Sequence, residues 1–206
     1  MVQDTTGLKA ALSVPRVYDF VQNALGARRA RRVVAAEFLR AKAGDFLLDV
    51  GCGTGEMLEH LPAGTRYLGL DLSASYIASA RARFGDRARF ECMDVNRAAE
   101  LDVANVDLAL AFGLLHHLDD QEVLALLATL KGLVRPGGRV VTIDPTLFSG
   151  QGAIAAFVAR QDRGRNVRSP EHYAALASGV FAQARPVVRN DLLRIPYSHC
   201  IIEMTP

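Results

Sequence analysis

The stretch FLLDVGCGTG, residues 46–55, decides the fold of this chain. Its first half, residues 46–50, is a nearly continuous apolar run flanked by glycines, which is typical of a strand buried on both faces of a parallel sheet. The three alternating glycines then predict a tight turn, because a residue without a Cβ lets the backbone approach a ligand closely. Residues 56–61 predict a helix whose free N–H groups point back at this turn, where they would hold a polar, charged small molecule. Taken alone, the stretch also fits an ordinary glycine-rich turn.

Composition predicts one globular domain without a nucleic-acid or membrane partner. The chain has 206 residues, half of them hydrophobic, which is enough for one substantial core. Its net charge of +2, from 24 Lys and Arg against 22 Asp and Glu, is no signature of polyanion binding. Cys52, Cys92 and Cys200 are far apart, which indicates neither a disulfide framework nor a zinc site. Because no segment has the pattern of a signal peptide or a membrane span, we expect a cytoplasmic protein.

Two acidic residues follow further predicted strands. Asp71 ends the predicted strand 67–71 and lies 20 residues after Gly51, the offset at which an acid binds the two ribose hydroxyls in a nucleotide-binding βαβ unit. Asp94 follows the next predicted strand, residues 88–92. Since the carboxyl ends of parallel strands meet at one edge of a sheet, the glycine turn and both acids are expected at the edge where open α/β sheets bind ligands.

These motifs resemble the class I S-adenosylmethionine-dependent methyltransferases. A predicted strand at 106–112 and a Pro-Gly-Gly turn that leads into a strand ending near 144 extend the resemblance over residues 46–143. It implies a three-layer α/β/α Rossmann-like sandwich with a seven-stranded, mostly parallel sheet whose last strand is antiparallel. It also implies S-adenosyl-L-methionine as cofactor, S-adenosyl-L-homocysteine as product, and methyl transfer to a small-molecule acceptor, with an oxygen of a sugar or other metabolite favoured.

The resemblance assigns the cofactor to residues at the ends of the predicted strands. Asp71 would bind the ribose, Asp94 would accept from the adenine amino group, and the backbone N–H of Val95 would meet a ring nitrogen. Tyr76 matches a position where the family sets a large side chain against the cofactor, and Phe112 would contribute its backbone. The complete expected set is Asp49, Gly51, Cys52, Gly53, Asp71, Leu72, Tyr76, Asp94, Val95 and Phe112.

Two adjacent histidines are the candidate catalytic residues. Many small-molecule methyltransferases carry a stretch similar to Leu-His-His-Leu at this place, between the methionine end of the cofactor and the acceptor. Either His116 or His117 could accept a proton from an acceptor hydroxyl, since imidazole is near half-neutral at physiological pH. Alternatively, both pack or cap the following helix, residues 122–130. A metal site is not indicated, because adjacent side chains diverge on a helix and no third ligand is apparent.

The acceptor side is expected to come from both ends of the chain. Within a single domain of residues 1–206, residues 1–43 would form cover helices, 44–145 the cofactor-binding core, and 146–206 acceptor-side helices and a final strand pair. Four arginines in the loop 160–168 are consistent with binding of an anionic group or with a solvated loop that contains internal ion pairs. The candidate substrate residues are Tyr18, Arg28, Arg31, Asp144 and Arg163.

Other functions compete with methyl transfer. A nicotinamide-dependent oxidoreductase would need glycine at position 56, where this chain has Glu56. A cofactor-binding regulator or scaffold that has lost turnover would keep the same motifs. Residues 191–199 resemble the ending of a bacterial methyltransferase group that is often encoded with surface-polysaccharide genes. We therefore expect a small-molecule methyltransferase that is a monomer or a homodimer.

Overall fold

One seven-stranded sheet organises the protein. The computed structural model describes residues 25–94, 97, 100, 103–161 and 164–206. The strand order is β3-β2-β1-β4-β5-β7-β6. β7 is antiparallel to both of its neighbours, and the other pairs are parallel, as predicted. The strands are β1 Phe46–Val50, β2 Arg66–Asp71, β3 Arg89–Cys92, β4 Val106–Phe112, β5 Val134–Pro145, β6 Gln183–Arg189 and β7 His199–Thr205.

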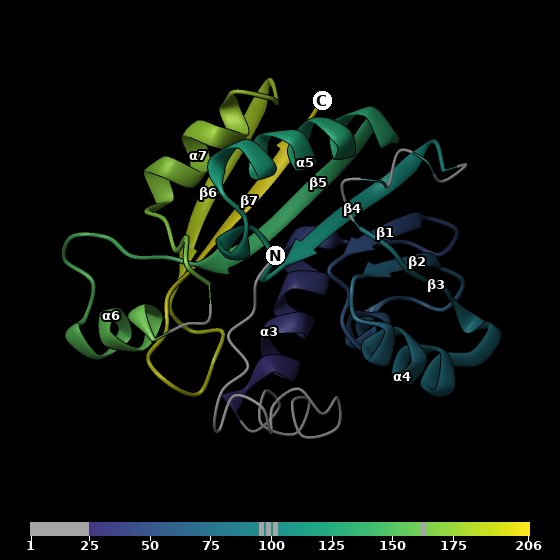
Figure 1. Ribbon diagram of the computed structural model, residues 1–206, viewed down its shortest axis with the longest axis horizontal. Coiled ribbons are helices and arrows are strands. Elements are labelled where there is room, and N and C mark those ends of the chain that lie inside the picture. Colours follow the sequence, from purple (N-terminus) through teal and green to yellow (C-terminus); the bar gives the residue numbers. More distant parts are fainter. Residues whose placement is uncertain (1–24, 95–96, 98–99, 101–102, 162–163) are drawn as a thin grey trace.

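Helices cover both faces of the sheet and complete the expected three layers (Figure 1). One apolar cluster joins the sheet to α5 and α7, and a second joins its other face to α3, the helical turns next to it and α4. None of the helices in the described ranges is both long and apolar enough to cross a membrane. The helices are α3 Ala27–Val33, α4 Ala74–Phe84, α5 Asp120–Leu133, α6 Ala153–Arg160 and α7 Pro170–Ser178, with short turns η1 Val34–Leu39, η2 Glu56–His60, η3 Gly85–Arg87 and η5 Leu115–His117.

β1 is buried on both faces, as its apolar run predicts. Leu48 and Val50 pack in the α5 cluster, whereas Leu47 packs in the α3 cluster. This alternation follows from the period of two in a strand. Asp49 therefore faces the same side as Leu47, toward α3.

Two predicted helices differ from the observed ones. Of the cover helices expected within residues 1–43, the one that starts at Ala27 is an α-helix only to Val33 and continues as a π-helical turn that ends at Leu39. The helix expected after the glycine turn is a short 3₁₀ segment, η2. Pro62 explains the second difference, because a residue before proline avoids the helical conformation, and Leu61 is extended.

We expect Gly69 in β2 to be required for packing beneath the glycine turn. A Cβ at this position would lie 2.7 Å from Cys52 Sγ and 2.8 Å from the Phe90 ring. Gly69→Ala should therefore lower the free energy of unfolding by about 1–3 kcal/mol, the range for overpacking a core. Urea denaturation measures this loss. Gly132→Ala in α5 is the control, because no atom lies within 4 Å of its added Cβ, and equal stability of both variants would contradict the prediction.

Candidate functional site

The glycine turn is fastened to the end of β2 and faces open space. The backbone N–H groups of Gly51 and Cys52 both donate to the carbonyl of Leu70, at 2.8 and 2.9 Å. The glycines have positive φ angles, which favour residues without a side chain. A Cβ built on Gly53 would meet no atom of the described residues within 4 Å. The backbone at Gly53 is thus free to lie against a bound molecule.

Asp71 joins this turn to α4. One of its carboxylate oxygens accepts from the N–H of Gly53 at 2.9 Å, and the other accepts from the N–H of Ser73 at 2.8 Å. Burial raises the pKa of Asp71, and these backbone bonds oppose the rise. Because each carboxylate oxygen accepts more than one hydrogen bond, both can also take a hydroxyl of a ligand. Next to Asp71, Leu72 leaves 45% of its surface exposed at this edge.

Asp49 contributes a buried oxygen that lacks a partner. Its Oδ2 accepts from the hydroxyl of Tyr67 at 2.6 Å. Its Oδ1 is buried and has no hydrogen-bond partner among the residues that the structure describes. Burial raises the pKa of Asp49 to about 7, and the Tyr67 bond and the charge of Arg31 oppose that rise. Leaving such an oxygen unsatisfied is unfavourable, so this position suits a donor supplied by a ligand.

Arg31 lies at the same edge, whereas Arg28 does not. The Arg31 side chain is mostly buried; it forms an ion pair with Glu56, and its guanidinium lies 5.8 Å from the centre of the Phe112 ring. Arg28 is largely exposed and lies 3.8 Å from Glu59 on the surface. Of these two candidate substrate residues, the structure thus brings only Arg31 to the ends of β1 and β4.

His116 and Asp144 form a buried pair on the other face of the sheet. The Asp144 side chain accepts from the backbone N–H of His116 at 3.2 Å and contacts its Nδ1 at 2.8 Å. Burial raises the pKa of Asp144, and the bond to His116 opposes the rise. With Nδ1 donating to the carboxylate, Nε2 becomes the basic nitrogen. The ring of His117 lies 4.1 Å from that of His116.

The other expected residues have less defined positions in the site. Burial and the neighbouring acids raise the pKa of the Cys52 thiol far above its ordinary value. Tyr76 and Asp94 are half-buried on α4 and after β3. The residues Tyr18, Val95 and Arg163 lie outside the described ranges. Within those ranges, no group of His, Cys, Asp and Glu side chains could hold a metal ion.

Sequence reasoning missed several polar contacts of the site. Glu56 was interpreted only as a departure from the dinucleotide-binding motif, but it is buried and holds Arg31. The sequence could have indicated a polar contact of Tyr67, because a tyrosine in a buried strand needs a partner for its hydroxyl. No pattern in the sequence indicated the contacts of Arg168, because its partners Leu115 and Leu118 are 53 and 50 residues away in the chain.

The sheet, the glycine turn and the acid at the end of β2 define a Rossmann-like nucleotide-binding domain. Comparison with known proteins finds similarity to methyltransferases over part of the chain. Residues 47–138 match the family model of a methyltransferase domain. The structure of the mitomycin 7-O-methyltransferase MmcR shares the fold, with a TM-score of 0.70 and 21% sequence identity over 96% of this chain and 57% of that one. Over residues 47–138 the chain is thus similar to a methyltransferase domain, and its fold is that of this methyltransferase structure.

Sequence relatives share this domain only in part. O-methyltransferase resE of Aspergillus sclerotiorum is 32% identical over 122 residues, which cover 56% of this chain and 45% of that protein. The 27-O-demethylrifamycin SV methyltransferase of Amycolatopsis mediterranei is 30% identical over 132 residues, which cover 61% of this chain and 47% of that protein. The chain therefore spans about half the length of these relatives.

We expect Asp71→Ala to weaken cofactor binding. The substitution removes the carboxylate that we expect to accept from the ribose hydroxyls, and it also removes the acceptor of the Gly53 N–H. Loss of such buried polar contacts should reduce the binding free energy of S-adenosylhomocysteine by about 1–3 kcal/mol. Isothermal titration calorimetry measures it, with Asp86→Ala, on an exposed turn, as the control. Unchanged affinity in Asp71→Ala would remove this residue from the site.

Cofactor affinity should also depend on pH through Asp49. The ionised carboxylate would accept from the amino group of the methionine part of the cofactor, but with a pKa of about 7 it is mostly protonated at pH 6. Binding of S-adenosylhomocysteine should therefore tighten about tenfold from pH 6 to pH 8. In Asp49→Asn, which cannot ionise, this pH dependence should disappear. Calorimetry at both pH values tests this. The same change of affinity between pH 6 and pH 8 in the wild type and in Asp49→Asn would exclude Asp49 as the titrating group.

Proposed function

We propose that this protein transfers a methyl group from S-adenosylmethionine to a hydroxyl oxygen of a small-molecule acceptor. The observation that carries the proposal is the buried His116–Asp144 pair at the carboxyl edge of the sheet that also bears the glycine turn and Asp71. The relatives support an oxygen acceptor, because their names describe O-methyl chemistry. Neither of them favours an oxidoreductase.

The residues at this edge fit the cofactor. Asp71 would bind the ribose hydroxyls, Leu72 and Asp94 would line the adenine, and the backbone at Gly53 would lie beneath the molecule. The unpartnered Oδ1 of Asp49 would accept from the amino group of the methionine part. When bound, S-adenosylmethionine supplies an electrophilic methyl group on a sulfonium. The buried surroundings exclude water and hold the acceptor close, which accounts for much of the expected rate.

His116 would accept the proton of the acceptor hydroxyl at Nε2. Asp144 holds Nδ1 at 2.8 Å, so it fixes the orientation of the ring and stabilises the positive charge that forms on it. A general base placed in this way contributes about 10²–10⁴ in rate. His117 is the second candidate, and the centre of its ring lies 4.1 Å from that of the His116 ring. Arg31, and Tyr18 and Arg163 outside the described ranges, remain candidate contacts of the acceptor.

Charge and composition support the remaining parts of the proposal. The near-balanced charge favours a small-molecule acceptor over a nucleic acid. The three cysteines are free in the structure, which fits the reducing cytoplasm. We place the protein there as a monomer or a homodimer.

The test is methyl transfer to fractionated cell metabolites, detected by mass spectrometry as a +CH₂ product that requires S-adenosylmethionine. Once an acceptor is found, His116→Asn should lower kcat about a hundredfold, because asparagine can still donate to Asp144 but has no basic nitrogen. Its affinity for S-adenosylhomocysteine should stay unchanged. His117→Asn is the matched control. Tight cofactor binding without any methylated product would instead favour the regulator or scaffold.

A further inference from the structure

A short segment, residues 164–168, lies across the histidine turn, residues 115–118. The backbone N–H of Asn166 donates to the carbonyl of His116 at 3.0 Å. Gly164 packs so closely on the imidazole that an added Cβ would lie 2.0 Å from His116 Cδ2 and 2.6 Å from its carbonyl oxygen. We call residues 164–168 the strap. Its backbone forms one wall of the position that His116 occupies.

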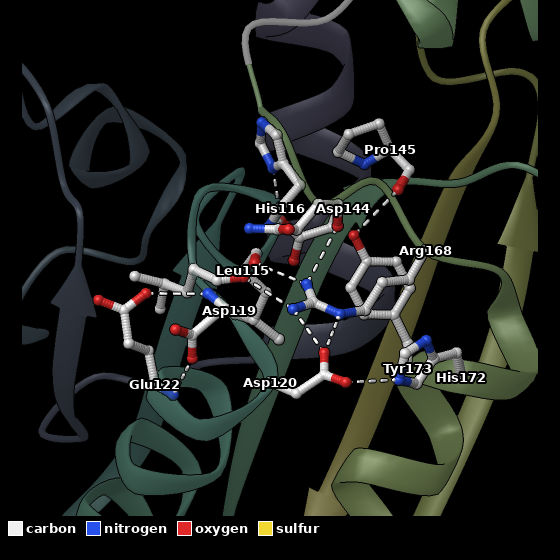
Figure 2. Close-up of polar contacts among 12 residues, drawn as sticks. Leu115, His116, Asp119, Asp120, Glu122, Asp144, Pro145, Arg168, His172 and Tyr173 are labelled. Carbon is white, nitrogen blue, oxygen red and sulfur yellow. Dashed lines mark hydrogen bonds and ion pairs between the residues drawn. The ribbon is translucent and has the colours of Figure 1, made fainter. Parts of the chain in front are cut away.

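Arg168 fastens the strap to both sides of the histidine turn. Its guanidinium is buried and donates to the carbonyls of Leu115 at 2.9 Å and Leu118 at 2.7 Å. Its Nε donates to Asp120, the first residue of α5, at 2.8 Å. Figure 2 shows the guanidinium between the turn and Asp120. The interpretation of residues 160–168 as a solvated loop is therefore wrong for Arg168. Because its guanidinium is already bound to these partners, Arg168 is also unsuited to bind an anion.

The backbone carbonyl of Arg168 closes a long loop that starts just after β5. The hydroxyl of Thr146, just after β5, donates to the Arg168 carbonyl at 2.9 Å, and the N–H of Leu147 donates to the same oxygen at 3.2 Å. The segment between these contacts contains α6 and returns to its starting point at Arg168. Arg168 thus connects the two ends of this loop to the turn that carries His116.

We propose that Arg168 and Gly164 are positioning residues for His116, an inference that rests on the function proposed above. The guanidinium fixes the carbonyls on both sides of the turn, and Gly164 lets the strap close on the ring. Together they hold the His116 Nδ1 against Asp144 and so fix which ring nitrogen is basic. A lysine would keep the charge, but it lacks the planar fork needed to bind two carbonyls and a carboxylate at once.

Nitrogen NMR of the imidazole rings tests this proposal without an acceptor. The full-length protein is labelled with ¹⁵N-histidine, and His116→Asn assigns the His116 signals. In the wild type, the two His116 nitrogens should have well-separated shifts, with the proton on Nδ1. In Arg168→Lys and in Gly164→Ala, the shifts should move toward each other as the turn loosens and the tautomers mix. Thermal unfolding, recorded for each variant, separates loss of folding from loss of positioning.

Arg139→Lys is the matched control, because Arg139 also donates to a backbone carbonyl, that of Leu39, on a part of β5 remote from His116. It should leave the His116 signals unchanged. His116 signals that match the wild type in a folded Arg168→Lys or Gly164→Ala protein would overturn the proposal. Gly164 has an ordinary φ angle, so alanine there acts through contact with His116 and tests the strap even if Arg168→Lys fails to fold.

Kinetics separate this proposal from the proposed function. With an acceptor identified, Arg168→Lys should lower kcat about tenfold or more, the effect of a misplaced catalytic group. In the His116→Asn background it should have no further effect, since residues that act through one another are not additive. Additive losses would contradict positioning through His116. Shifted NMR signals in a protein that methylates no acceptor would refute the proposed function and leave the positioning role intact.

Discussion

Asp71 binds the N–H of Gly53 with one carboxylate oxygen and the N–H of Ser73 with the other, and the geometry of the site depends on this pair of bonds. The first bond holds the glycine turn at the end of β2, and the second holds the start of α4. A single half-buried carboxylate thus links the glycine turn directly to the start of α4. Burial raises the pKa of Asp71, and the hydrogen bonds from the backbone oppose this rise because they favour the charged carboxylate.

The features that the sequence predicted are local ones. The apolar run of β1, the turn at Gly51 and the acid Asp71 each follow from residue type and spacing, because a strand period and a glycine turn are encoded within a few residues. The seven-stranded, mostly parallel sheet with an antiparallel last strand followed from the family resemblance, and the structure confirms it. The end of η2 at His60 was also within reach, since Pro62 restricts Leu61, the residue before it, to an extended conformation.

The features that the sequence did not predict join distant segments. Gly164 and Arg168 sit in a polar loop whose composition suggests solvent, yet their partners are the histidine turn and the start of α5. Nothing in a window of residues distinguishes a buried arginine from an exposed one when its acceptors are backbone carbonyls. The same holds for Asp144, whose neighbour His116 lies 28 residues away in the chain. Such contacts depend on how β4 and β5 pair, because this pairing places the end of β4, near His116, beside the end of β5, at Asp144.

Two buried carboxylates lie on opposite faces of the sheet. Asp49 faces α3 with Tyr67, while Asp144 lies near Tyr173 of α7 with His116, and β4 runs between them. Each has one oxygen held by a ring side chain and one that is buried without a hydrogen-bond partner among the described residues. The groups that shift the pKa of Asp49 do not include Asp144, and the reverse also holds. Because each acid has its own partner on its own face of the sheet, a substitution that removes the Tyr67 bond of Asp49 leaves the His116 bond of Asp144 in place.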